Sequence, residues 1–380
     1  MHPILSQPFS PTAASPTAAI VIYPLDDLAV FEATGADALS FLQGQITNDL
    51  LNLGAEQAKL AGYCTAQGRL LATMVMAELP EPPANLKGQG APLAGSSVLA
   101  DGQQPDVRPT SHALIGLMRQ DILASVLKRL SMFVMRAKAK LNVSTYRVVG
   151  VSVLATEALA LSQALGHTLP HTPWQLTAAT TGLWICAPSA AQQSGTASHR
   201  WWWLASEAHA QTCQGLALPT VLGTLEQWHY QDISAGLPWI EAATLDLLIP
   251  QTLNLDLIEG VSFTKGCYPG QEIVARSHYR GTVKRRMHLG KIESAQAVSL
   301  KAGTDIFDAQ GSEQACGRVI NIASLVGQPA DGASHSGDTG AAYLLFETTF
   351  DALEHNALHL GARDGAPITL LSLPYTTKPA

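Results

Sequence analysis

The segment KGCYPGQE at residues 265–272 places a cysteine between a lysine and a carboxylate on a glycine-rich backbone. The two glycines let this backbone turn tightly and approach a ligand closely. Pro269 and Glu272 are typical of the first turn of a helix. A thiolate is favoured beside a lysine and before a helix N-terminus, so Cys267 is a candidate reactive thiol and Lys265 the cation that would stabilise it. A buried structural thiol beside a turn fits the same local chemistry, and both interpretations stay open at this point.

The remaining four cysteines are Cys64, Cys186, Cys213 and Cys316, and they form no C-x-x-C pair. We therefore expect no metal site built from ligands adjacent in sequence. An odd number of cysteines without a secretory signal fits a reducing compartment. Cys64 is a conceivable second ligand, but a single cysteine in a hairpin is more often a packing residue.

A family resemblance extends from this segment through most of the chain. KGCYPGQE, followed by Arg276, resembles the signature segment of the YgfZ family, and Trp228, Ile233 and Gly236 look like its W-x-x-x-x-I-x-x-G pattern. The opening segment at 35–49 also resembles that of the family. Further matching positions are Cys64, Gly68 and Arg69 in a hairpin, and Pro250, Gln251, Asn254, Leu255, Gly260, Val261, Ser262 and Phe263 before the cysteine loop. The resemblance covers nearly all of residues 20–290.

The resemblance implies a fold and a cofactor. YgfZ proteins are similar to the T-protein of the glycine cleavage system, so we expect an α+β, aminomethyltransferase-like fold whose subdomains surround a central hole that holds tetrahydrofolate. A pterin needs an aromatic face and a few fixed polar groups, and Trp228 is the candidate face. The other expected cofactor-binding positions are Leu28, Tyr268, Gly270, Gln271, Glu272 and Asn254. Leu28 stands where some family members have a second tryptophan.

The strand that follows the turn of the first hairpin separates this chain from the catalytic aminomethyltransferases. Those enzymes carry a glycine followed shortly by paired aspartates, whereas residues 68–72 read GRLLA here. Leucine and alanine cannot accept a proton or orient a cation. We therefore expect an accessory protein rather than an enzyme with turnover.

The resemblance also implies a function, the assembly or repair of iron–sulfur clusters in client enzymes, including radical enzymes that thiomethylate tRNA. Folate near Trp228 would organise the cavity, and Cys267 would offer its thiolate to a cluster, a sulfur species or a one-carbon adduct. Two alternatives remain. The first is a folate-dependent one-carbon transferase, and the second is an adaptor that binds a client without using folate or Cys267.

The elements that must position these residues follow from periodicity. A strand at 28–33 precedes a helix that carries Ala38, Leu39 and Leu42 on one face, with Thr34 and Asp37 at capping-box spacing. Residues 65–68 join strands 58–64 and 69–77 in a hairpin, and residues 120–133 form an amphipathic helix. Further strands are expected at 146–154, 181–187 and 201–205, with a helix at 156–165. Because strand side chains alternate between faces, the Trp201–Trp203 run predicts burial rather than one stacking surface.

The chain divides into an N-terminal lead-in at 1–19, a folate-binding domain at 20–282 and a C-terminal β-barrel at 283–376. Short strands at 287–292, 317–322 and 341–346 predict the barrel. Two stretches of low complexity, an insertion at 79–111 and a loop at 327–340, bury too little apolar surface to order themselves.

Composition restricts the partners. A net charge of −7 over 380 residues argues against a broad grip on nucleic acid. We interpret the basic run at 284–286 as a solvated strand edge rather than an RNA site. No apolar run approaches the roughly 18 residues of a membrane span. We expect a soluble, cytoplasmic protein whose partners are folate and iron–sulfur client enzymes, without direct nucleic-acid or membrane binding.

Overall fold

The computed structural model describes residues 20–79, 113–190, 198–213, 220–279, 283–293, 300–325 and 340–377. The expected lead-in lies outside these ranges. The expected insertion also lies outside them apart from its first residue, and the expected C-terminal loop apart from its last.

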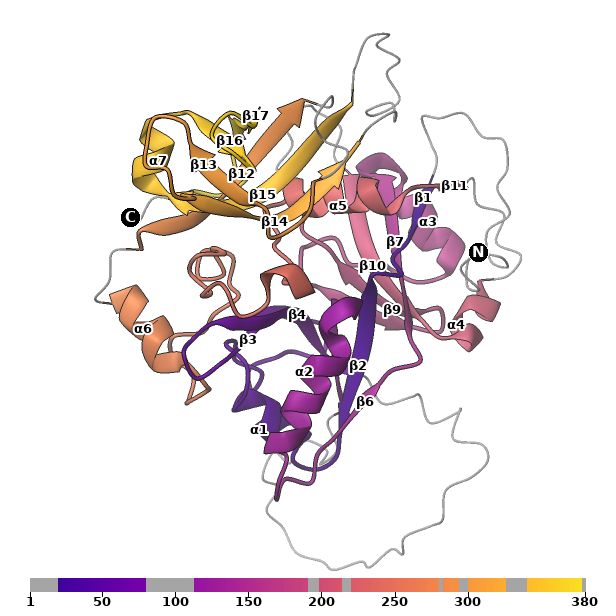
Figure 1. Cartoon of the computed structure of the whole chain (residues 1–380). Coiled ribbons are helices and arrows are strands. Elements are labelled where there is room, and N and C mark those ends of the chain that lie inside the picture. Colours follow the sequence, from indigo (N-terminus) through magenta and orange to yellow (C-terminus); the bar gives the residue numbers. More distant parts are fainter. Residues whose placement is uncertain are drawn as a thin grey trace, which may run out of the picture.

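A five-stranded antiparallel sheet carries the first hairpin and lies at the bottom of Figure 1, with α1 and α2 beside it. Its order is β3-β4-β5-β2-β6. The strands are β2 (Leu28–Thr34), β3 (Ala58–Cys64), β4 (Leu70–Leu79), β5 (Ala113–Arg119) and β6 (Lys140–Val143), and the helices are α1 (Ala38–Gln43) and α2 (Gln120–Phe133). The predicted helix at 120–133 is confirmed, and α2 buries the apolar stripe that predicted it.

The hairpin of β3 and β4 forms as predicted, and Gly68 at its turn has a φ of +74°, which glycine adopts without steric cost. The predicted capping box before α1 is wrong. Asp37 is the N-cap residue but makes no side-chain capping bond, and its carboxylate instead accepts the backbone N–H of Lys138. The predicted core face of α1 is confirmed: Ala38 and Leu42 are buried, Leu39 is half-buried against the same core, and Phe41 joins them.

A six-stranded sheet, on the right of Figure 1, combines the first strand of the chain with later ones in the order β11-β1-β7-β10-β9-β8. Its strands are β1 (Ile20–Pro24), β7 (Arg147–Leu154), β8 (Leu176–Ala179), β9 (Gly182–Cys186), β10 (Ser198–Ala205) and β11 (Thr220–Leu222). The short helix η2 (Ala155–Glu157), α3 (Ala158–Leu165) and α4 (Glu207–Thr212) accompany it. The Trp201–Trp203 run is buried as predicted, because Trp202 joins the main core while its two neighbours join the core on the opposite face.

The third sheet is the predicted barrel, at the top of Figure 1, with the order β17-β16-β13-β14-β15-β12-β18. Its strands are β12 (Arg285–Glu293), β13 (Asp305–Asp308), β14 (Gly317–Ser324), β15 (Ala341–Thr349), β16 (Leu358–Leu360), β17 (Ala366–Pro367) and β18 (Thr369–Leu371), with α7 (Phe350–Glu354) between β15 and β16. The two end strands of this order, β17 and β18, are separated by one residue in the chain, which brings the edges of the sheet together and nearly closes the barrel.

Two helices and a long loop segment connect the sheets. Helix α5 (Leu225–Ser234) starts at a capping box of Thr224 and Gln227 and packs on β14, β15 and β1. The chain then passes through η3 (Ala242–Thr244) and a series of turns to α6 (Gln271–Tyr279), which stands apart at the left of Figure 1. The main core contains side chains from all three sheets and therefore joins them. The domain division between residues 282 and 283 stays a prediction.

Within the described ranges, no helix has both the length and the apolar character needed to cross a membrane.

Candidate functional site

The signature loop lies against the turn of the first hairpin. Gly270 has a φ of +80°, and a Cβ at this position would stand 2.4 Å from the carbonyl oxygen of Thr65 and 2.6 Å from the Cα of Gly68. Only glycine permits this approach, because any other side chain would collide with backbone atoms. The carbonyl of Gly270 then accepts the N–H groups of Ile273 and Val274 in the first turn of α6. The loop and the helix are thus fixed to the β3–β4 hairpin.

Lys265 anchors the other end of this loop. Its Nζ donates to the backbone oxygens of Gln43 at 2.5 Å, Ile46 at 2.6 Å and Asn48 at 3.0 Å, and lies 5.2 Å from the ring centre of Tyr268. An ammonium group has three N–H donors, so these carbonyls use all of them. Burial lowers the pKa of Lys265 to about 8, a shift that nearby Asp49 opposes.

These contacts do not fit the expected role of Lys265 as the partner of a Cys267 thiolate. Every donor of the ammonium group is directed to the segment at 43–48, and no hydrogen bond joins Lys265 to Cys267 within the described part of the chain. Lys265 instead connects the signature loop to the opening segment, which lies more than 200 residues earlier in the sequence.

Cys267 is exposed, while its neighbour Tyr268 is buried. The loop therefore presents the thiol to solvent and inserts the aromatic ring beneath it. Cys64 is buried, and this burial raises the pKa of its thiol to about 12, which keeps it protonated and poorly reactive. Across the described residues, no three histidine, cysteine or carboxylate side chains lie close enough together to hold a metal ion.

Three other expected site residues lie in and before this loop. Gln271 makes a long contact of 3.5 Å to the carbonyl of Lys265, and Glu272 is exposed at the start of α6. Asn254 is fully buried with a φ of +58°, and its Nδ2 donates to the carbonyl of Met287 at 2.9 Å. Asn254 thus ties the turns before the loop to the barrel.

Trp228 does not provide the exposed aromatic face expected of it. Its ring is 0% exposed, packs against Gly150, Tyr23 and Trp202, and lies 4.9 Å from the guanidinium of Arg200. The spacing of residues along a helix does not reveal which side chains of other elements surround a tryptophan. Here such side chains surround Trp228 on all sides. A ligand could stack on this ring only after core side chains moved away.

Leu28 is also buried, and it pairs with Arg119 across β2 and β5. It belongs to the same main core as Trp228. Neither position lines a described cavity, and the structure therefore does not bring them together with the signature loop into one accessible site.

Two adjoining hollows offer a different aromatic face, which the sequence interpretation missed. Their volumes are about 280 Å³ and 220 Å³, and both are lined by Trp174, Ile258 and Glu259. Trp174 is only partly buried, and its ring stacks on Trp202 with 6.0 Å between ring centres. The Tyr375 hydroxyl at the edge of the larger hollow donates to the carbonyl of Gly236.

Trp174 gives no periodic signal in the sequence, because it follows a proline in an irregular connection and has a φ of +69°. Glu259, at +59°, stands one residue before the matched run at 260–263. The position of Glu259 beside that run is the one sequence feature that could have directed attention to this hollow.

Comparison with known proteins identifies relatives of this chain. A tRNA-modifying protein YgfZ from Edwardsiella ictaluri is 27% identical over 98% of both chains. Its counterpart from Escherichia fergusonii is 30% identical, covering 74% of this chain and 76% of the relative. The chain belongs to the YgfZ family. A further relative of the same name, from Yersinia pseudotuberculosis, is 28% identical over 73% of each chain. No protein-family model matches the chain.

The fold of this YgfZ-family chain is that of an aminomethyltransferase, as expected. The glycine cleavage system aminomethyltransferase T from Bartonella henselae superimposes with a TM-score of 0.60 at 13% identity, covering 95% of this chain and 87% of that one. The strand β4, on which the sequence lacks the paired aspartates of the catalytic aminomethyltransferases, begins with Leu70, Leu71 and Ala72, all of them buried. The start of β4 is therefore apolar in sequence and also buried in the fold.

The hollows around Trp174 fit the head group of a folate in three respects. Trp174 supplies a flat aromatic surface. The exposed carboxylate of Glu259 could accept the two N–H groups on the pyrimidine edge of a pterin, because a carboxylate accepts such paired donors. Ile258 adds an apolar side chain to the lining of both hollows, as small-molecule sites require.

Proposed function

We propose that this YgfZ-family protein is a folate-dependent accessory factor for the assembly or repair of iron–sulfur clusters, and that its clients include enzymes that thiomethylate tRNA. Its relatives from Edwardsiella ictaluri and Escherichia fergusonii are named as tRNA-modifying proteins, which supports a role beside such enzymes. The observation that carries the proposal is the exposed thiol of Cys267 on a loop anchored at Lys265 and Gly270.

An exposed thiol on an anchored loop suits contact with a partner. A thiolate is the ligand that iron–sulfur clusters use in proteins. Cys267 is the one cysteine in the signature loop, so the client's cluster would keep its remaining ligands from the client or from a small thiol. The anchors reduce the entropy that ordering the loop would cost on contact.

Folate would bind in the hollows around Trp174, with its pterin on the Trp174 ring and its pyrimidine edge on Glu259. Bound tetrahydrofolate supplies a reduced pterin able to carry a one-carbon unit. Trp174 would orient the ring, Glu259 would fix its edge, and the apolar side chain of Ile258 would exclude water from the same hollow. Aminomethyl transfer by the usual mechanism is not proposed, because β4 offers leucine and alanine in place of carboxylates.

Titration calorimetry with tetrahydrofolate tests the site. We expect Trp174→Leu to weaken binding by about tenfold or more, since stacking of a heteroaromatic ring contributes about 1–3 kcal/mol. Glu259→Gln should weaken it by a similar factor, because the neutral amide offers one acceptor where the carboxylate offers two. Tyr279→Leu, which changes an exposed ring on α6, is the matched control and should bind as the wild type does. Equal affinity of Trp174→Leu and the wild type would place the folate elsewhere.

A further inference from the structure

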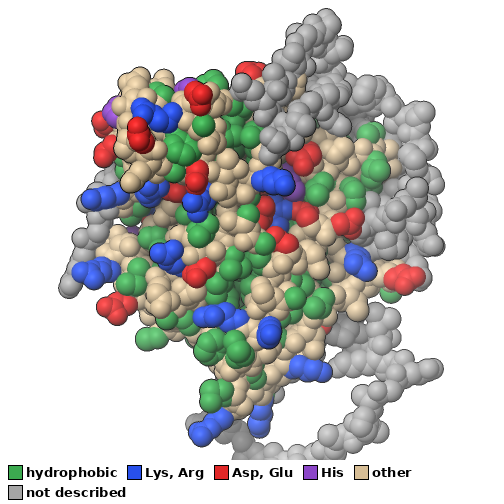
Figure 2. Space-filling view, in the orientation of Figure 1, with side chains coloured by type: hydrophobic (Ala, Val, Ile, Leu, Met, Phe, Trp, Pro, Cys, Tyr) green, Lys and Arg blue, Asp and Glu red, His purple; other side chains and the backbone are tan. Residues whose placement is uncertain are grey.

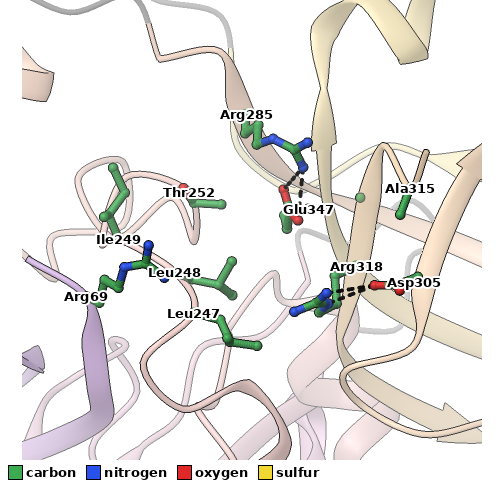
Figure 3. A pocket seen from close by; sticks show the side chains of 11 residues that line it. Arg69, Leu247, Leu248, Ile249, Thr252, Arg285, Asp305, Ala315, Arg318 and Glu347 are labelled. Carbon is green, nitrogen blue, oxygen red and sulfur yellow. Dashed lines mark hydrogen bonds and ion pairs between the residues drawn. The ribbon is translucent and has the colours of Figure 1, made fainter. Parts of the chain in front are cut away.

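A third pocket, of about 400 Å³, lies between the barrel and the hairpin loop. Arg69 enters it from the end of the hairpin turn, just before β4, and the segment at 247–249 forms its apolar wall. The barrel contributes Arg285 from β12, Arg318 from β14 and the carboxylates of β13 and β15. Figure 3 shows Arg69 and Arg318 on opposite sides of the pocket, with Leu247 and Leu248 between them.

The charges in this pocket do not balance. Arg285 donates to Glu347 at 2.9 Å and Arg318 donates to Asp305 at 2.8 Å, as the dashed lines in Figure 3 mark. Among the described residues, the guanidinium of Arg69 has no carboxylate partner, and its one hydrogen bond goes to the carbonyl of Asp246 at 3.2 Å. Three guanidinium groups therefore face two carboxylates, and one positive charge is left for a ligand.

The surface around the pocket carries charges of both signs, so the excess of positive charge is confined to the pocket. Over the barrel and the region beneath it, Figure 2 shows basic and acidic side chains interspersed. A mixed surface creates no broad field that would hold a long polyanion. Arg69 is exposed where it lines the pocket, and its single fork-shaped group of donors suits one compact anion, because guanidinium matches the geometry of phosphate oxygens.

The apolar wall limits the ligand further. Leu247 is 37% exposed and lies beside the arginine that lacks a carboxylate partner, so a ligand can cover apolar surface and meet a positive charge together. Inorganic phosphate would leave this wall uncovered. The volume lies within the roughly 300–1,000 Å³ range of small-molecule sites.

We propose that this pocket binds a nucleotide, with its phosphate on the guanidinium of Arg69 and its base or sugar over Leu247. The wall and the uncompensated guanidinium together select a phosphate that is attached to an apolar or aromatic group. The site is separate from the hollows around Trp174 and does not rest on the folate proposal, since no lining residue is shared.

Calorimetric titration of the full chain with AMP, adenosine and inorganic phosphate tests the proposal. We expect saturable AMP binding that is at least about tenfold tighter than adenosine binding, because adenosine lacks the charge-assisted hydrogen bonds. Arg69→Gln should weaken AMP binding about tenfold. Arg147→Gln removes another exposed arginine, at the start of β7, and should leave AMP binding unchanged.

A second variant makes the test independent of Arg69. Leu247→Asp places a negative charge on the exposed wall and should abolish AMP binding without disturbing the fold. A short adenylate RNA identifies the source of the nucleotide. Competition between this RNA and AMP would assign the pocket to a nucleotide within a strand, and AMP binding without competition would assign it to a free nucleotide. Absence of saturable AMP binding, equal affinity for adenosine, or unchanged affinity in Arg69→Gln would overturn the proposal.

Discussion

Replacing Lys265 by methionine tests whether this residue anchors the signature loop. The substitution keeps an unbranched apolar side chain but removes the ammonium group. The carbonyl oxygens of Gln43, Ile46 and Asn48 then lose a donor that lies within 2.5–3.0 Å of each of them. Because these carbonyls belong to the end of α1 and the turn after it, the loss should free the signature loop from the opening segment.

The magnitude follows from two opposing contributions. Hydrogen bonds to a charged group contribute about 1.5–3 kcal/mol each. The substitution also removes the cost of burying an ammonium ion, which amounts to several kcal/mol. We therefore expect a net loss of about 2–4 kcal/mol in the free energy that holds the two segments together.

Hydrogen–deuterium exchange measures this loss where it occurs. Peptides covering residues 41–50 and 260–270 should lose about 30-fold or more in protection, since every 1.4 kcal/mol corresponds to a factor of ten. Peptides of the barrel, such as those covering β15, should exchange as in the wild type. A global melting temperature is less informative, because a chain of this size need not unfold in one step.

Lys59→Met is the matched control. Lys59 donates to the carbonyls of Asp49 at 2.8 Å and Asn52 at 3.1 Å in the same region, but it is less buried and belongs to a different contact. Its substitution should leave the peptides at 260–270 protected. If Lys265→Met exchanged no faster than Lys59→Met in those peptides, the anchoring role of Lys265 would be refuted.

Three further predictions concern His288, Arg200 and Gly270. Burial and nearby Arg286 lower the pKa of His288 to about 4, so the unfolded state binds more protons between pH 6.5 and 4 and stability falls as the pH falls through that window. The free energy of unfolding should therefore fall between pH 7 and pH 4.5, and His288→Phe should remove up to about 3 kcal/mol of that fall. Denaturant titrations at the two pH values would measure it. Arg200→Met should destabilise the protein by about 3–5 kcal/mol, because it leaves buried Asp232 without its ion-pair partner at 2.7 Å. Adding Asp232→Asn to this variant removes the unpaired charge and should restore part of the melting temperature. Gly270→Ala should lower the free energy of unfolding by about 1–3 kcal/mol, because of backbone strain and a clash with Thr65. Gly266→Ala, where space is open, should leave the free energy of unfolding within about 0.5 kcal/mol of the wild type, as denaturant titrations would measure.

Local patterns in the sequence predicted the elements that carry strong periodicity. The stripe of α2, the turn at Gly68 and the alternating burial of Trp201–Trp203 all depend on contacts within a few residues, or on the two-residue repeat of a strand. The barrel was predicted for the same reason, from short strands separated by turns.

The site was harder to predict, because its contacts join distant parts of the chain. The nearest heavy atoms that a Cβ at Gly150 would meet belong to the ring of Trp228, and nothing in the W-x-x-x-x-I-x-x-G pattern reveals that packing. The partners of Lys265 lie 217–222 residues away, whereas the local sequence pairs this lysine with its neighbour Cys267. Trp174 lies in an irregular connection, and only the folded structure shows that it lines both hollows.

The level of thiomethylated tRNA in cells that lack this protein tests the central claim most directly. Cells are supplied with the wild type, with Cys267→Ala, or with Cys316→Ala as a control at a partly buried barrel cysteine. The account predicts that the wild type and Cys316→Ala restore the modification and that Cys267→Ala does not, although all three accumulate equally. Full restoration by Cys267→Ala would contradict a role for the exposed thiol.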